Sequence, residues 1–251
     1  MSRAAAFAYA GARLQARHGD RPGPGEWERL GRVADFGRYL QLARGTGLGP
    51  FVRAIGRNAG AHEVERLLRL AFRGHVAEVA AWQPAQWRAG VRWVSALAEL
   101  PFLGHLLAED GAFPWMDALP ETGALARRPP EARPRALATG PLAPLAPAGR
   151  EGPTLLERWL RHWRYLLPAA PGAFGPPLAH LERSLRRFRG EVARGSGEAP
   201  EGHLEAELTH LFRQHTREPA GAYAHLGLTA LDLERARSHL LRRRLFPGEA
   251  P

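Results

Sequence analysis

The chain contains no cysteine and no lysine, and each absence excludes a class of chemistry. Without cysteine there are no disulfides, no thiolate metal sites and no thiol nucleophiles, a composition that is compatible with a cytoplasmic protein. Without lysine, the glycine-rich stretch Gly45–Gly49 cannot be an ATP-binding P-loop, which needs a Gly-Lys-Ser/Thr sequence. An arginine-rich chain with abundant Ala, Gly and Pro is typical of a GC-rich genome, so arginine cannot be interpreted as a choice over lysine.

Long apolar runs are also missing, because none approaches the ~20 residues that a membrane-spanning helix needs. The N-terminus has a basic start and an apolar stretch, as a signal peptide has, but Arg13 and Arg17 follow at once. We therefore expect a first helix there rather than a secretion signal. The predicted location is cytoplasmic, either free or peripheral to a membrane complex. A length of 251 residues fits one large domain or two small ones.

The charge balance is strongly basic, with a formal net charge of +10 and an isoelectric point near 11.2. A charge of this size favours acidic partners such as nucleic acid, anionic lipid or an acidic protein. The alternative is that the charge serves solubility alone.

Helical periodicity dominates the pattern, and no segment shows the sustained alternation of a β-strand, so the predicted fold is all-α. We expect a multi-helix array of amphipathic helices. Asp35 and Thr154 are predicted N-caps, and the last helix is predicted to begin at Thr229 or Asp232. The other predicted helices cover residues 26–32, 62–81, 85–100, 102–108, 155–167, 176–192 and 204–215.

The segment 120–153 interrupts this pattern with a proline every few residues. Such a sequence cannot form a helix interior and buries little apolar surface. It predicts a Pro-rich linker, or a poorly ordered excursion over the surface, between two helical blocks. The predicted division is an N-terminal block at 1–119, the linker at 120–153 and a C-terminal block at 154–251.

Two stretches resemble a known family. Asp35–Phe51, DFGRYLQLARGTGLGPF, and Arg217–Pro247, REPAGAYAHLGLTALDLERARSHLLRRRLFP, each have the pattern of a helix, a tight turn and a helix. Together with Phe7–Arg17 and Glu63–Phe72, they resemble the start and the C-terminal element of the C/d family of V-type ATPase subunits. Members of that family begin with a Y-A-Y and A-R segment, an acidic helix, an L-x-x-T-x-Y-G-P turn and a Glu-rich helix.

The resemblance implies a non-catalytic interaction or assembly protein that links the rotary stalk of an ion-transporting ATPase to its membrane ring. Members of the family build three similar helical lobes around a funnel that receives the stalk. The implied partners are protein subunits of a membrane-associated ATPase or ion-translocating complex, with no cofactor. This chain departs from the pattern in its short middle, where the Pro-rich segment replaces further helices, and in its basic charge.

The alternative function is that of a basic helical nucleic-acid-binding protein, using the arginine face of Arg183, Arg186, Arg187 and Arg189. The chain lacks a convincing recognition helix and an aromatic stacking platform for that role. Most tryptophans lie on apolar stripes and are predicted to be core residues, whereas Trp115 follows a proline in a segment of mixed polarity and is predicted to be an exposed anchor. The candidate partner-binding residues are Trp115, Arg183, Arg186, Arg187, Arg242, Arg243 and Arg244.

A third interpretation, a metalloprotein, depends on His203, Glu207 and His210, which share one helix face. Glu207 and His210 form a Glu-x-x-His unit of the kind that di-iron bundles use, but such bundles need a second unit and two further Glu residues. The chain has no second Glu-x-x-His. The alternative is that these are surface histidines on an exposed helix, which accounts for the spacing equally well. We predict no catalytic residue, no cofactor site and no metal site beyond these three candidates.

Overall fold

A computed structural model describes residues 3–108, 111–147, 152–169, 172–195 and 200–246, and within these ranges the chain is all-α, without a strand. The longer helices are α1 (Arg3–Gly19), α2 (Pro24–Gly31), α3 (Phe36–Arg44), α5 (Ala61–Trp82), α6 (Ala85–Arg92), α8 (Leu100–Leu107), α10 (Arg133–Thr139), α11 (Leu155–Leu166), α12 (Gly175–Arg194), α13 (Pro200–His215) and α14 (Pro219–Leu245). The short ones are α4 (Gly49–Val52), α7 (Val94–Leu97) and α9 (Gly123–Ala126), with 3-10 helices η1 (Pro114–Ala118), η2 (Pro130–Ala132), η3 (Ala143–Leu145) and η4 (Gly172–Phe174).

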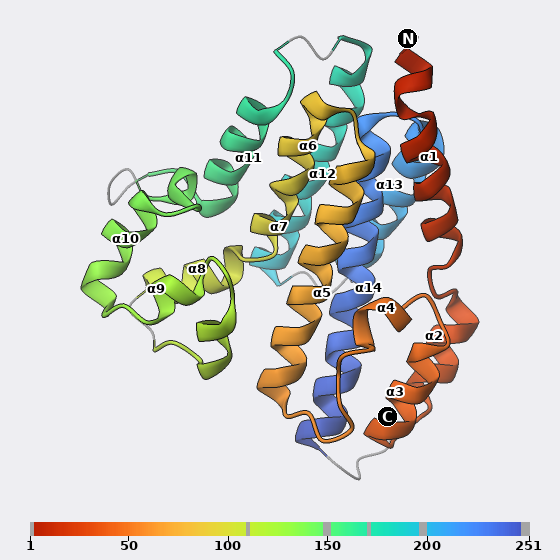
Figure 1. The fold of residues 1–251 in the computed structure, drawn as a ribbon, viewed down its shortest axis with the longest axis vertical. Helices are drawn as coiled ribbons and strands as arrows, with labels where there is room; N and C mark the ends of the chain where they lie inside the picture. The colour runs from red at the N-terminus through yellow and green to blue at the C-terminus, as the bar shows by residue number, and fades with distance from the viewer. Residues whose placement is uncertain (1–2, 109–110, 148–151, 170–171, 196–199, 247–251) are drawn as a thin grey trace.

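Helices α5 and α14 run side by side through the middle of the molecule, and α1 and α13 also pack against α14 (Figure 1). The buried side chains form one hydrophobic cluster that draws on both ends of the chain. The first and last thirds of the sequence therefore share a core. Among the described residues, no helix combines the length and the apolar character that crossing a membrane requires.

Helix α14 begins at Pro219, so the predicted start at Thr229 or Asp232 is wrong. Nearly every residue from Pro219 to Thr229 is buried, so this part of the helix has no exposed polar face and no amphipathic period. Proline at the first helical position sets the start. The second family-like stretch is thus one continuous helix rather than two helices around a turn.

The two predicted N-caps are confirmed. The carboxylate of Asp35 accepts a hydrogen bond from the Arg38 amide at 2.7 Å, and the hydroxyl of Thr154 accepts one from the Glu157 amide at 3.2 Å. The helix expected over 85–100 is instead interrupted at Trp93, between α6 and α7. At this break the indoles of Trp93 and Trp159 each donate to the other residue's backbone carbonyl, at 3.2 and 3.1 Å.

The Pro-rich segment is packed over its described part, so the expectation of an unstructured linker is wrong for residues 120–147. It forms α9, η2, α10 and η3, with prolines in the first turns, where a missing amide costs little. Its leucines Leu125, Leu137, Leu142 and Leu145 are buried. Residues 148–151 of the predicted linker lie outside the described residues.

Candidate functional site

A cleft of about 640 Å³ opens between the turns that follow α1 and α3 and the paired helices α5 and α14. Its polar lining comes from segments far apart in the sequence. The residues that define it chemically are Arg17, Arg21, His75, Glu78, His225, Thr229 and Asp232.

Two buried histidines lie in the wall of this cleft. His75 on α5 and His225 on α14 are 8% and 2% exposed, and their Nε2 atoms are 2.9 Å apart. One ring must donate, since two lone pairs facing each other would repel. Nδ1 of His75 lies 3.7 Å from a carboxylate oxygen of Glu78, so the favoured tautomer places a proton on that nitrogen and makes His225 the donor. Nδ1 of His225 is then a buried acceptor without a hydrogen-bond partner.

Burial keeps this pair uncharged. Desolvation lowers the pKa of His75, with Glu78 opposing the shift. Desolvation also lowers the pKa of His225 well below its ordinary value, and the neighbouring His75 and His18 add to the effect. At neutral pH the contact between α5 and α14 is therefore a hydrogen bond between two neutral rings.

The charged groups of the cleft pair with one another. Nε and Nη2 of Arg21 donate to the two carboxylate oxygens of Asp232 at 2.6 and 3.0 Å, and Nη2 also contacts Glu205 at 3.1 Å. Arg17 donates to Glu78 at 3.2 Å. Burial raises the pKa of Asp232, and the bond from Arg21 opposes that shift. The Arg21–Asp232 pair joins the turn after α1 to the middle of α14, and the Arg17–Glu78 pair joins the last turn of α1 to the C-terminal part of α5.

The hydroxyl groups of the cleft are also engaged within the fold. Thr46 donates to the carbonyl of Ala43 at 2.8 Å, and Thr229 donates to the carbonyl of His225 at 3.0 Å. A nucleophilic hydroxyl would instead be hydrogen-bonded to a base. Both hydroxyls therefore bond within their own turn or helix, whereas the ion pairs and the histidine contact of the cleft link different elements.

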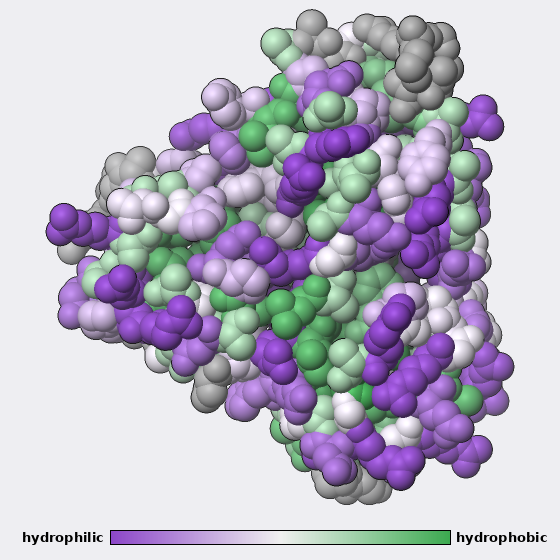
Figure 2. Space-filling view, in the orientation of Figure 1, coloured by the Kyte–Doolittle hydropathy of each residue, from purple (hydrophilic) through white to green (hydrophobic). Residues whose placement is uncertain are grey.

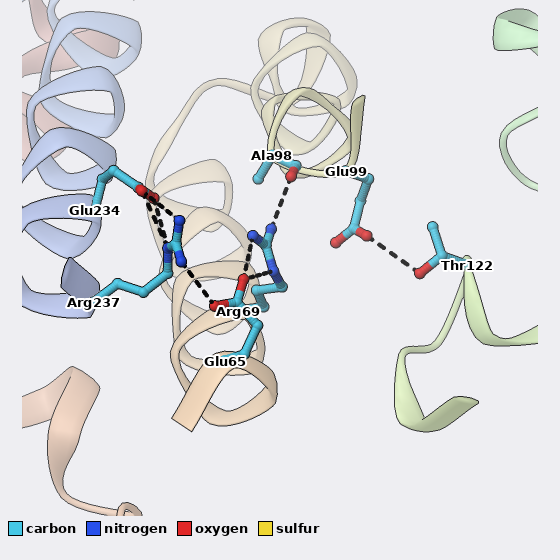
Figure 3. Close-up of polar contacts among 7 residues, drawn as sticks. All are labelled: Glu65, Arg69, Ala98, Glu99, Thr122, Glu234 and Arg237. Carbon is cyan, nitrogen blue, oxygen red and sulfur yellow. Dashed lines mark hydrogen bonds and ion pairs between the residues drawn. The ribbon is translucent and has the colours of Figure 1, made fainter. Parts of the chain in front are cut away.

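A second polar cluster lies between α5, α14 and the α7–α8 turn (Figure 3). Arg69 donates to Glu65 at 2.7 Å and to the carbonyl of Ala98 at 2.8 Å, while Arg237 contacts Glu65 at 3.4 Å. Nearby, Thr122 donates to the buried carboxyl of Glu99 at 3.3 Å. Burial raises the pKa of Glu99, and the positive charges of Arg69 and Arg73 oppose the shift.

Trp115 is part of this second cluster and not an exposed anchor, so that prediction is wrong. Its side chain is 7% exposed, and its ring meets Phe102 edge to face at 4.7 Å. The guanidinium of Arg69 lies over the Phe102 ring at 3.8 Å. The expected core position of the other tryptophans is confirmed for Trp27, Trp82, Trp87, Trp159 and Trp163, and Trp93 is partly buried against the core.

The candidate arginines separate into exposed and buried ones. On α12, Arg186 pairs with Glu157 and Glu182, Arg187 pairs with Glu207, and Arg183 is exposed with no ion pair to a described residue. At the end of α14, Arg242 and Arg244 are exposed, and Arg244 donates to the carbonyl of Asn58 at 2.9 Å.

Arg243 is buried, which removes it from the candidate partner surface. It is 8% exposed and donates to the backbone carbonyls of Leu30, Gly31 and Val33 at 3.1, 2.9 and 2.5 Å. These carbonyls lie at and just beyond the C-terminus of α2, where helix carbonyls lack partners in the helix. Arg243 therefore caps α2 from α14.

The three candidate metal ligands do not form a site. His203 and His210 are exposed, and the carboxylate of Glu207 pairs with Arg187. Within the described ranges, no group of three His, Cys, Asp or Glu side chains could hold a metal ion.

The cluster of His75, His225, Arg21 and Asp232 was not predicted from the sequence. The available signal was a histidine inside the buried stripe of α5, between Phe72 and Val76. Searches against protein-family models, curated proteins and solved structures found no match to this chain.

Proposed function

We propose that this chain is a non-catalytic interaction or assembly protein, related to the C/d family of V-type ATPase subunits. Its partners would be components of a membrane-associated rotary or ion-translocating complex, which it would contact from the cytoplasmic side as a peripheral protein. It would act by binding these components through its helical surface rather than by catalysing a reaction.

The observation that carries this proposal is the contact between the two stretches that resemble the family. The Tyr39 hydroxyl of α3 lies 3.4 Å from Nδ1 of His239 on α14, and the Arg243 guanidinium lies over the Tyr39 ring at 4.6 Å. Arg244 lies over the ring of Phe36 at 5.4 Å. Residues singled out by sequence resemblance alone are thus structural neighbours, as expected if both belong to one inherited architecture.

The cleft supports the non-catalytic part of the proposal. Arg17 pairs with Glu78 and Arg21 pairs with Asp232, the two threonine hydroxyls bond to backbone carbonyls, and the two histidines bond to each other. Groups poised for catalysis are usually directed at a substrate position and carry pKa values matched to proton transfer near neutral pH. These groups are instead directed at one another.

Affinity purification from the native cell tests the proposal. The tagged chain, isolated in mild detergent after nuclease treatment, should retain identified components of a rotary ATPase in fixed stoichiometry. The matched control is Arg128→Gln/Arg135→Gln, which removes two exposed charges at and near α10 and should retain the same components. Retention of nucleic-acid-associated proteins alone, or a turnover that purified protein performs without partners, would overturn the proposal.

Nucleic-acid binding remains the second candidate because Arg183 and Arg189 are exposed on α12 without an ion pair to a described carboxylate. It is less favoured because the adjacent Arg186 and Arg187 are neutralised by glutamates. A salt titration separates the two functions. Nucleic-acid affinity should fall by about one log unit per log unit of salt for each phosphate contacted.

A further inference from the structure

A second, more open groove of about 480 Å³ lies along α3, at the end of the molecule where α2, α3 and the C-terminal end of α14 meet (Figure 1). Hydrophilic side chains cover much of this end in the view of Figure 2. We call it the α3 groove, and its lining is Asp35, Gly37, Arg38, Gln41, Leu42 and Arg57.

The α3 groove differs from the cleft in that its positive charges are unpaired. Arg38 and Arg57 are both exposed, and no described carboxylate forms an ion pair with either guanidinium. Arg21 and Arg17 of the cleft, by contrast, each pair with an acidic side chain. Two like charges that line one groove create a positive potential, which an anionic group bound between them would relieve.

The groove is also held in shape by contacts that do not involve its own charges. Arg44 donates to the carbonyl of Ile55 at 2.7 Å and Arg244 donates to that of Asn58 at 2.9 Å, which fixes the loop that carries Arg57. A Cβ atom at Gly37 would lie 3.3 Å from Nε of Arg57, so the glycine lets the Arg57 side chain lie close across α3. A groove that is already ordered loses less entropy when it binds.

We propose that the α3 groove binds an acidic segment of a partner protein, which places its carboxylates on Arg38 and Arg57 and an apolar side chain against Leu42. The inference rests on the proposed interaction function and names the surface that would serve it. Guanidinium groups bind carboxylates through paired, charge-assisted hydrogen bonds. The half-buried Leu42 supplies an apolar contact next to them.

A protein segment fits this lining better than a nucleic acid does. The Asp35 carboxylate forms part of the wall and repels any anion, so the groove favours a segment whose acidic residues are spaced by apolar ones over a phosphate backbone with a charge at every nucleotide. The groove lining contains no aromatic ring on which a base would stack. A segment of mixed acidic and apolar residues matches both features.

Peptide binding tests the inference. The probe is a fluorescent twelve-residue peptide of alternating Glu-Glu and Leu units, with a Gln-for-Glu peptide and a twelve-nucleotide oligo-dT as comparison ligands. The groove variant is Arg38→Gln/Arg57→Gln, and the matched control is Arg128→Gln/Arg135→Gln, which removes the same charge at and near α10. Equal thermal unfolding midpoints establish that both variants are folded.

We expect the acidic peptide to bind the wild-type chain and the matched control with similar affinity, and the groove variant at least about ten-fold more weakly. The Gln-containing peptide should not bind. Equal weakening in both variants would mean that only net charge matters and would overturn the proposal. So would an absence of peptide binding, or tighter binding of oligo-dT that the groove variant loses.

Failure of this inference is distinguishable from failure of the proposed function. If the groove variant still retains rotary-complex components from the native cell, the partner docks elsewhere. That result would contradict the assignment to the α3 groove but not the proposed function. If the wild-type chain retains none of them, the proposed function falls, while the peptide measurement still decides whether the groove binds acidic segments.

Discussion

Arg21 and Asp232 form a buried ion pair between residues 211 positions apart, with both carboxylate oxygens of Asp232 accepting from one guanidinium. Arg21 lies in the turn after α1, and Asp232 lies near the middle of α14. Only 14% of the arginine side chain and 8% of the aspartate side chain are exposed. The pair therefore fixes the N-terminal turn against the helix that runs through the core.

Removing one partner of this pair should be costly. We expect Asp232→Ala to lower the free energy of unfolding by about 3 kcal/mol, the low end of the range for breaking a buried ion pair, because Arg21 keeps only its contact with the half-exposed Glu205. The double variant Arg21→Met/Asp232→Ala should be more stable than the summed losses of Arg21→Met and Asp232→Ala indicate, because neither charge of the pair is left buried. Urea unfolding of the wild type, the two single variants and the double variant measures the coupling. Strictly additive losses would show that the two residues act independently.

Local features of this fold were accessible from the sequence because they depend on neighbouring residues. Apolar spacing predicted α5, and side-chain chemistry predicted the Asp35 and Thr154 caps. The start of α14 was not accessible, since a helix buried on all sides has no polar face to reveal its period. The packing of residues 120–147 was missed because their proline content predicts exposure, whereas the leucines between the prolines are buried.

The candidate site was less predictable than the fold. The spacing of His203 and His210 along one helix face is typical of metal ligands, which made them candidates, but both side chains are exposed. The buried pair His75 and His225 comes from two helices and has no motif, because its 2.9 Å contact exists only once α5 lies beside α14. Arg243 was assigned to the surface by its place in a basic run, yet only the fold brings it to the carbonyls of α2.

Arg243 should matter for stability far more than its exposed neighbours. We expect Arg243→Met to cost about 2–4 kcal/mol, because it leaves buried carbonyls at the end of α2 unpaired and each such group costs about 1–3 kcal/mol. Arg244→Met, which removes one exposed bond to Asn58, should cost under about 1 kcal/mol. Chemical denaturation of both variants makes the comparison. Similar small losses would show that Arg243 does not cap α2.

Stability should fall as the pH falls below neutrality. Burial, with Arg243, Arg235 and Arg242 nearby, lowers the pKa of His239 from 6.5 to about 4 in the folded chain. Between these values the unfolded state binds a proton that the folded state does not, so the stability present above pH 6.5 is progressively lost toward pH 4. One such group contributes at most about 1.4 kcal/mol per pH unit.

The variant His239→Phe isolates this contribution. It keeps an aromatic ring against Trp27 and Tyr39 but cannot bind a proton. The slope of unfolding free energy between pH 7 and pH 5 should be smaller in the variant than in the wild type. The buried acids Glu99 and Asp232 contribute equally to both proteins and cancel in the difference. Identical slopes would contradict the lowered pKa.

Gly47 marks a close approach between two turns. A Cβ atom there would lie 1.9 Å from the backbone oxygen of Asp20, a distance that requires the backbone to move. We expect Gly47→Ala to destabilise the fold by about 1–3 kcal/mol, the usual cost of overpacking. Gly56→Ala is the matched control, because a Cβ at Gly56 meets nothing within 4 Å. Thermal unfolding compares the two, and equal midpoints would show that the turns are not in close contact.

Leu240 tests whether the last helix is part of the core. Its side chain is fully buried on α14, whereas Leu245, a little over one turn later, is 58% exposed. We expect Leu240→Ala to cost about 2–5 kcal/mol, the range for a buried leucine that leaves a cavity behind. Leu245→Ala should change stability by less than about 0.5 kcal/mol, as exposed substitutions usually do. Urea denaturation of the two single variants gives both values under identical conditions. If Leu240→Ala proved as mild as Leu245→Ala, the end of α14 would be a peripheral tail, and its contact with α3 could not support the proposed relation to the ATPase family.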